Sequence, residues 1–166
     1  MFKCISTIIL LFCIFCDKPA PSIHPLPEFT KKWEVRGGRY ADKPVLVRIN
    51  RGLDSIADHA PLTWQAAASI PLKHPLPSGL PDSSEVAALK KIEKFLTYRL
   101  ATSGIALFAL KVETDNRCDY IFYTDNRDAV DKTFKHIGAM INNYPIDFSM
   151  KRDKKWVTYR WFSSIE

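Results

Sequence analysis

Residues 105–123 read IALFALKVETDNRCDYIFY, and this stretch decides the fold. Residues 105–112 form an almost continuous apolar run, which is typical of a strand buried on both faces. Residues 114–117 form a turn, in which Asn116 tolerates the left-handed backbone conformation. Residues 118–123 then return as a second strand. The stretch therefore predicts a central β-hairpin with apolar side chains on both of its faces.

A helix is predicted on each side of this hairpin. The first helix runs from a capping residue within residues 82–84 to Gly104, and its apolar residues recur at spacings of three and four. The second helix begins at a cap formed by Asp125 or Asn126 and ends at residues 142–145. Both patterns predict amphipathic helices that pack one face against the sheet.

Two further strands are predicted, at residues 63–72 and 146–150. The resulting order is the ferredoxin-like βαββαβ pattern of the α+β class, in which two helices pack on one face of an antiparallel sheet. Because the central hairpin is apolar on both faces, we expect the second face to be covered as well. The candidates are an amino-terminal β-hairpin within residues 33–50 that turns at residues 37–38, a short aromatic element within residues 153–162, and a partner chain.

The amino terminus has the pattern of an export signal. Residues 5–16 (ISTIILLFCIFC) are apolar and follow a single charge at Lys3. This run is shorter than the about 20 residues that a membrane-spanning helix needs, and it matches the apolar core of a secretory signal. We expect a signal peptide over residues 1–22, cleaved after Ser22, and an exported protein, periplasmic or secreted, without a transmembrane segment once the signal is removed. Two alternatives are an uncleaved anchor and lipidation at Cys16, which a bulky preceding residue disfavours.

The remaining chain is expected to contain a Pro-rich tether at residues 23–32 and one α+β domain at residues 33–162. The hydrophobic fraction of 46% excludes a chain that is disordered throughout. The net charge is +6, but the basic residues are scattered, which indicates a solvated surface more than a nucleic-acid binder and leaves an anionic ligand open. After cleavage Cys118 is the one remaining cysteine, so no intramolecular disulfide is expected.

The sequence predicts no catalytic residue, metal site or cofactor. The four histidines have no ligand spacing on a common element, and no Gly-rich phosphate loop is present. Glu85 and Glu93 lie on one helix about 12 Å apart along its axis, which is too far for an acid/base pair. Tyr120 and Phe122 alternate on a central strand, as base-stacking residues do in RNA-recognition domains, although Asp119, which precedes Tyr120, would repel phosphate.

Several residue groups together resemble a known bacterial family. They are Trp33, the strand end Arg48-Ile49-Asn50, Gly79-Leu80-Pro81 followed by Glu85, Leu89 and Ile92-Glu93, the turn from Thr114 to Arg117 with Tyr123, and finally Asp153, Trp156 and Tyr159. This set resembles domain-of-unknown-function family 695. That family is similar in turn to the ribonuclease E inhibitor RraB. The resemblance implies a ferredoxin-like fold and no established chemistry, and a cytoplasmic ribonuclease partner fits poorly with export.

We therefore expect an uncharacterised exported protein that acts as a non-enzymatic binding or interaction module, with a protein partner or an anionic ligand. The candidate binding residues are Trp33, Arg48, Tyr123, Trp156 and Tyr159. One alternative is a hydrolase-like enzyme whose site is assembled across elements, which a pocket joining Glu85 or Glu93 to Arg48 and a tyrosine would favour. A second alternative is RNA binding, or regulation of a ribonuclease, through the sheet.

Overall fold

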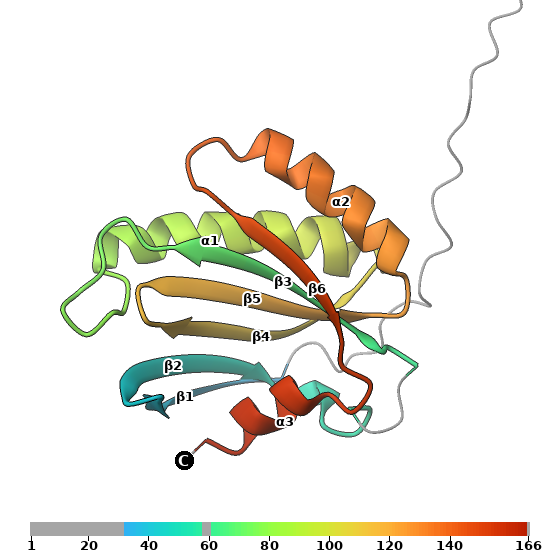
Figure 1. The fold of residues 1–166 in the computed structure, drawn as a ribbon, viewed down its shortest axis with the longest axis horizontal. Helices are drawn as coiled ribbons and strands as arrows, with labels where there is room; N and C mark the ends of the chain where they lie inside the picture. Colours follow the sequence, from blue (N-terminus) through green and yellow to red (C-terminus); the bar gives the residue numbers. More distant parts are fainter. Residues whose placement is uncertain (1–31, 58–60, 166) are drawn as a thin grey trace, which may run out of the picture.

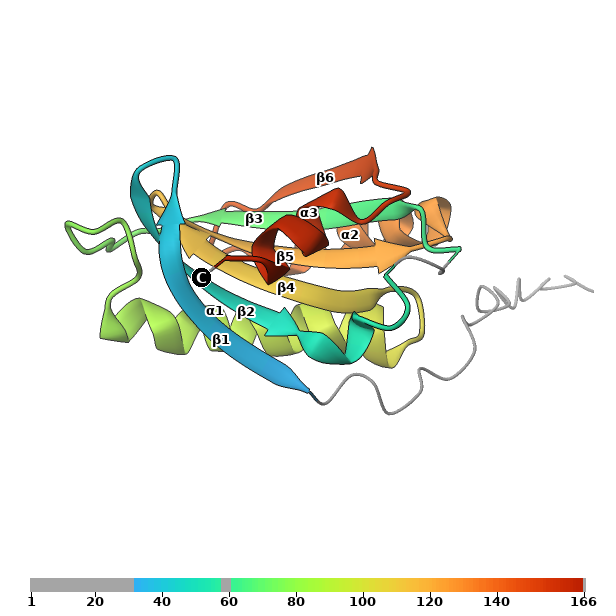
Figure 2. The same cartoon turned by 90° about the horizontal axis from the view of Figure 1, so that it is seen from below.

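The computed structural model describes residues 32–57 and 61–165. These residues form an antiparallel six-stranded sheet and three α-helices (Figures 1 and 2). The strands are β1 (Trp33–Tyr40), β2 (Lys43–Asn50), β3 (Trp64–Pro71), β4 (Leu107–Thr114), β5 (Arg117–Thr124) and β6 (Asp147–Arg152). The helices are α1 (Ser83–Thr97), α2 (Arg127–Met140) and α3 (Val157–Ser163), with a short 3-10 helix at Arg51–Leu53 and a π-helical turn at Tyr98–Thr102.

The strand order of the sheet is β1-β2-β4-β5-β3-β6. This confirms the predicted α+β class and the antiparallel sheet, but the order differs from that of a four-stranded ferredoxin-like sheet. The difference arises because the amino-terminal hairpin does not lie across a sheet face. Instead β2 pairs with β4 along its length, so that the hairpin extends the sheet by two strands. Pairing at this edge satisfies the backbone groups that β4 would otherwise leave open.

Two tight turns close the hairpins. The β1–β2 turn lies at Ala41 and Asp42, whose φ angles are 47° and 63°, so the predicted turn at residues 37–38 was wrong and β1 continues through both glycines. The β4–β5 turn lies at Asp115 and Asn116, with φ angles of 49° and 61°. Positive φ at both central residues is the geometry that matches the twist of paired strands.

Side-chain caps fix the starts of the two long helices. The Asp82 carboxylate accepts a hydrogen bond from the backbone N–H of Glu85 at the start of α1, and Asn126 accepts one from Ala129 at the start of α2. Each cap satisfies one of the backbone donors that the first turn of a helix leaves unpaired. Both caps lie where the sequence predicts them.

The sheet separates two cores. Helices α1 and α2 cover one face, where Tyr120 and Phe122 of β5 are fully buried. Helix α3 lies on the opposite face, and Trp156, Tyr159 and Phe162 pack there against β2, β4 and β5 (Figure 2). Of the expected covers for the second face, the carboxy-terminal aromatic element is therefore the one observed.

The loop at Gly79 packs against the β4–β5 turn. Gly79 has a φ of 80°, and its carbonyl accepts a hydrogen bond of 2.9 Å from the N–H of Asn116. A Cβ atom on Gly79 would lie 3.3 Å from the backbone nitrogens of Asp115 and Asn116. Glycine is therefore required both by the backbone conformation and by the close approach of the two chain segments.

Within the described residues, no helix combines the length and the apolar character that crossing a bilayer requires. The predicted signal peptide and all but the last residue of the predicted tether lie outside the described residues.

Candidate functional site

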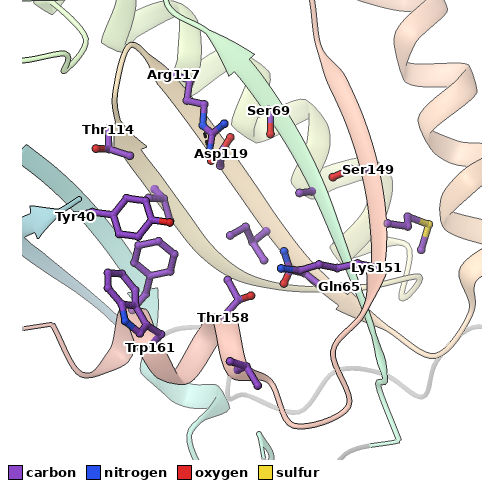
Figure 3. A pocket seen from close by; sticks show the side chains of 16 residues that line it. Tyr40, Gln65, Ser69, Thr114, Arg117, Asp119, Ser149, Lys151, Thr158 and Trp161 are labelled. Carbon is purple, nitrogen blue, oxygen red and sulfur yellow. Dashed lines mark ion pairs between the residues drawn. The ribbon is translucent and has the colours of Figure 1, made fainter. Parts of the chain in front are cut away.

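Helix α3 covers only part of its face of the sheet, and a pocket of about 600 Å³ lies beside it (Figure 3). Strands β3, β4, β5 and β6 form the floor of this pocket. Its wall comes from α3 and from the end of β1. Segments that are far apart in the sequence therefore contribute to one concave surface, as is usual for ligand sites.

Small side chains on the central strands create the hollow. Ala67 of β3 lies between Ile121 of β5 and Ser149 of β6 in the register of the sheet, and Ser69 lies two residues further along β3 on the same face. Large residues at these positions would fill the space that α3 leaves open. The sequence AAAS at residues 66–69 therefore allows the sheet to pack against the helices on one side and to stay concave on the other.

Two buried polar side chains line the pocket without full hydrogen bonding. Gln65 is 6% exposed and Asp119 is 9% exposed. Neither Gln65 Oε1 nor Asp119 Oδ1 has a hydrogen-bond partner among the described residues. A buried polar atom left unsatisfied costs about 1–3 kcal/mol. A bound hydrogen-bond donor that reaches either of these two oxygens would therefore stabilise the protein.

Basic groups stand beside these acceptors. Arg117 Nε lies 3.1 Å from Asp119 Oδ2, which leaves the other carboxylate oxygen unpartnered. Lys151 of β6 lies opposite Gln65 of β3 and is exposed. The formal charges of Arg117, Lys151 and Asp119 sum to +1, so the lining of the pocket carries a net positive formal charge.

An aromatic pair forms the wall. The rings of Tyr40 and Trp161 meet edge to face with centroids 5.0 Å apart, and each residue is 43% exposed. Tyr40 is the last residue of β1, and the tight turn that follows it places its ring beside α3. Partly exposed aromatic rings at a pocket rim offer an apolar surface to a ligand.

Three of the five predicted binding residues anchor α3 in the core. The rings of Tyr123 and Trp156 stack with centroids 3.9 Å apart, and the Tyr123 hydroxyl donates to Asp153 Oδ2 at 2.8 Å. The Tyr159 hydroxyl donates to Asp54 Oδ1 at 2.6 Å. Burial raises the pKa of both tyrosines well above the usual range, so the hydroxyls stay protonated donors. These residues hold the helix that forms the pocket wall and do not line the pocket.

The other two predicted residues lie on the opposite face of the sheet. The Arg48 guanidinium lies 4.6 Å from the Trp33 ring centroid and pairs with Glu93 Oε1 of α1 at 2.5 Å. The Trp33 ring also packs on Phe108. The structure therefore divides the five predicted residues between two locations and places none of them in the pocket.

The carboxylates considered for catalysis have structural partners. Glu85 is 2% exposed and accepts hydrogen bonds from the backbone N–H groups of Lys73 and His74, at 2.7 and 2.8 Å. The buried tyrosine of β5, Tyr120, is also engaged, since its hydroxyl donates to the Leu89 carbonyl at 2.9 Å. Neither glutamate belongs to the lining of the pocket described above. Among residues 32–57 and 61–165, no group of three or more metal-ligating side chains comes together.

The geometry opposes base stacking on β5. Tyr120 and Phe122 have no exposed surface, because α1 and α2 cover them. The residues of β5 that point to the open face are the alternate ones, Asp119 and Ile121, which line the pocket. A base could reach Tyr120 or Phe122 only if the helices separated from the sheet.

Sequence reasoning missed the pocket residues, although a signal was present. Asp119 is a charged residue inside an otherwise apolar strand, and it is expected to be paired or functional when buried. The small residues at 66–69 also departed from the pattern of bulky side chains in a buried strand. Only the pairing of β3 with both β5 and β6 brings these two signals to one surface.

Comparison with known proteins identifies the family of this chain, and it finds no similar curated protein or solved structure. The model of DUF695, a family of unknown function, matches residues 31–163. The family match covers most of the chain and includes all six strands and three helices described above. The chain therefore belongs to the DUF695 family, a family of unknown function.

Proposed function

We propose that this protein is a non-enzymatic binding module that holds a small polar ligand in the pocket between α3 and strands β3, β5 and β6. The observation that carries the proposal is the pair of unpartnered buried oxygens, Gln65 Oε1 and Asp119 Oδ1, in the lining of a cavity of about 600 Å³. A cavity with a few convergent polar groups and an aromatic wall is the usual form of a small-molecule site.

Binding is favoured over catalysis by the chemistry of the lining. Its hydroxyl groups belong to Ser69, Ser149, Thr114, Thr158 and Tyr40, and no histidine or cysteine stands among its described residues. The Thr114 hydroxyl donates to the Pro44 carbonyl at 2.8 Å. A nucleophilic hydroxyl needs a general base within hydrogen-bond distance, and no hydroxyl of the lining donates to Asp119 Oδ1, which has no partner among the described residues.

The module would act outside the cytoplasm. The apolar run at residues 5–16 and the small residues before a cleavage point at Ser22 support a signal peptide. Fractionation of cells that express the full chain, with the mass of the mature protein, tests this part. A mass that begins after Ser22 supports export with cleavage. A lipid-modified Cys16 would retain export and contradict cleavage after Ser22, and an intact chain in the cytoplasm would contradict both.

A related proposal concerns the organisation of the sheet. The elements from β3 to β6 would form a ferredoxin-like unit to which the β1–β2 hairpin has been added at the edge. The antiparallel pairing of β3 with both β5 and β6, and of β4 with β5, supports this reading.

The binding proposal is tested by blocking the pocket. Ser149 is exposed on β6 and lines the cavity, so Ser149→Trp fills it without replacing a core residue. Ser83→Trp, at the exposed start of α1, is the matched control. The probes are glucose, glucuronate, glutamate, adenosine monophosphate and inorganic phosphate, each titrated calorimetrically into the full-length protein.

We expect at least one probe to bind the unaltered protein and the Ser83→Trp variant, and to bind the Ser149→Trp variant at least about fivefold more weakly, since overpacking costs about 1–3 kcal/mol. No binding by any probe would refute the proposal. Binding that is unchanged in Ser149→Trp would refute the assignment to this pocket.

A further inference from the structure

We infer that the ligand of the pocket is an acidic saccharide unit, meaning a sugar ring that carries adjacent hydroxyls and one carboxylate. The inference rests on the proposed binding function and names the class of ligand for the same site. Three separate features of the lining lead to it: the two unpartnered acceptors, the aromatic wall and the balance of charge.

The acceptors require a ligand with hydrogen-bond donors, which the hydroxyls of a sugar supply. Gln65 Oε1 and Asp119 Oδ1 are both buried and unpartnered, and their residues are 6% and 9% exposed. A sugar hydroxyl can donate to such an oxygen and accept from another group at the same time. Ser69 and Ser149 line the same floor, and their hydroxyls can donate to the oxygen atoms of the sugar (Figure 3).

The wall requires a ligand with an apolar surface as well as polar edges. Tyr40 and Trp161 are both partly exposed at the rim, and Phe162 lines the pocket behind them. The C–H groups on the face of a pyranose ring pack on an aromatic face, toward which the positive edge of a C–H bond is attracted. A sugar ring presents this apolar face and its hydroxyl edge at once, which matches a site that has an aromatic wall and a polar floor.

The charges favour an acid over a neutral sugar. Arg117 neutralises Asp119 through the contact of 3.1 Å, whereas Lys151 makes no ion pair among the described residues that line the pocket. A carboxylate on the ligand would pair with Lys151 and bring the occupied site to neutrality. Because Lys151 is exposed, this pair adds selectivity more than affinity, and salt weakens it.

Two other ligand classes fit the lining less well. Phosphate offers mainly acceptor oxygens, so it would leave Gln65 Oε1 and Asp119 Oδ1 unpartnered and would face the Asp119 carboxylate. A free amino acid provides no ring for the aromatic wall, and its ammonium group would enter a pocket whose formal charge is already +1 from Arg117, Lys151 and Asp119.

The test compares D-glucuronate with glucose, which has the same ring without the carboxylate, in calorimetric titrations of the full-length protein. We expect a Kd on the order of 1 mM for glucuronate, as befits a ligand of this size. Glucose should bind about threefold more weakly, the scale of one exposed ion pair. That difference should shrink as sodium chloride is added, while the affinity for glucose stays constant.

Two lysine variants locate the carboxylate. Lys151→Gln should remove the preference for glucuronate over glucose and leave the glucose affinity unchanged. Lys155→Gln removes the same charge from an exposed position outside the pocket, so it should retain the preference. Equal effects of the two variants would mean that the overall charge of the protein, and not this site, selects the acid, and would overturn the inference.

The outcomes separate this inference from the proposed function. Glutamate, adenosine monophosphate or phosphate bound in place of glucuronate, and lost in Ser149→Trp, would overturn the saccharide assignment and retain the pocket as a binding site. Glucose bound as tightly as glucuronate would overturn the acidic assignment alone. The absence of binding by every probe would overturn both.

Discussion

The hydrogen bond between Tyr123 and Asp153 provides a quantitative test of how α3 is held on the sheet. The Tyr123 hydroxyl donates to Asp153 Oδ2 at 2.8 Å and accepts from the Tyr159 N–H at 3.3 Å, and Tyr123 is fully buried. Tyr123→Phe deletes this hydroxyl and keeps the ring that stacks on Trp156. Because a hydrogen bond to a charged group is worth about 1.5–3 kcal/mol, we expect a loss of about 2 kcal/mol in the free energy of unfolding.

Urea denaturation measures this loss, and thermal denaturation should show a fall of about 8 °C in Tm for a domain of this size. Tyr98→Phe is the matched control, since Tyr98 is 63% exposed and its loss of a hydroxyl should change stability by less than about 0.5 kcal/mol. A change below about 0.5 kcal/mol in Tyr123→Phe would refute the reasoning. So would equal changes in the two variants.

Four further predictions concern other parts of the fold. Glu85→Gln weakens the two hydrogen bonds from the N–H groups of Lys73 and His74, so the unfolding free energy in urea should fall by about 1–3 kcal/mol and those two amides should exchange with deuterium faster. Asn116→Val forces a β-branched residue into a position with φ of 61°, which should cost about 1–2 kcal/mol in the same assay, whereas Asn116→Gly should not destabilise. Burial raises the pKa of the Cys118 thiol to about 12, so iodoacetamide at pH 8 should leave the Cys118 peptide unmodified in the folded protein and alkylate it in urea, as read by mass spectrometry. Because the thiol pKa is higher in the folded state, Cys118 favours folding below about pH 9, and this contribution should be lost between about pH 9 and pH 12, where Cys118→Ser should flatten the fall in stability.

Local patterns in the sequence predict most of the secondary structure. The alternating apolar residues of the strands, the spacing of three and four in the helices, and the caps at Asp82 and Asn126 all act within a few residues, so they are visible before any fold is known. The turn at residues 37–38 was predicted wrongly because glycine pairs usually mark turns. The actual turn uses Ala41 and Asp42. Aspartate tolerates a positive φ, but alanine rarely adopts one, so this turn has a weaker signal than the glycine pair.

Long-range pairing could not be predicted in the same way. Whether the amino-terminal hairpin lies across the sheet or extends it depends on the contact of β2 with β4, which are separated by more than fifty residues of sequence. The aromatic residues Tyr123, Trp156 and Tyr159 were expected at a binding surface. They are instead buried together, because Trp156 takes a φ of 52° and turns the chain so that α3 lies on the sheet.

The candidate site was harder to predict than the fold because it is a cavity, formed where side chains are small and a buried polar atom lacks a partner. Ala67 and Ser149 contribute to it by being small, and Asp119 by lacking one partner. None of these features forms a motif with a fixed spacing. They become a site only when the pairing of β3 with β5 and β6 brings them together.

The alternation of side chains along β3 has a consequence for how members of this family could diverge. Ala66 and Ala68 face the helical core, while Ala67 and Ser69 face the pocket. Substitutions at the second pair change the shape and polarity of the cavity, and they leave the interface with α1 and α2 untouched. The lining of the cavity can therefore change by a few single-residue steps on one side of a strand, without first losing the stability that the other side provides.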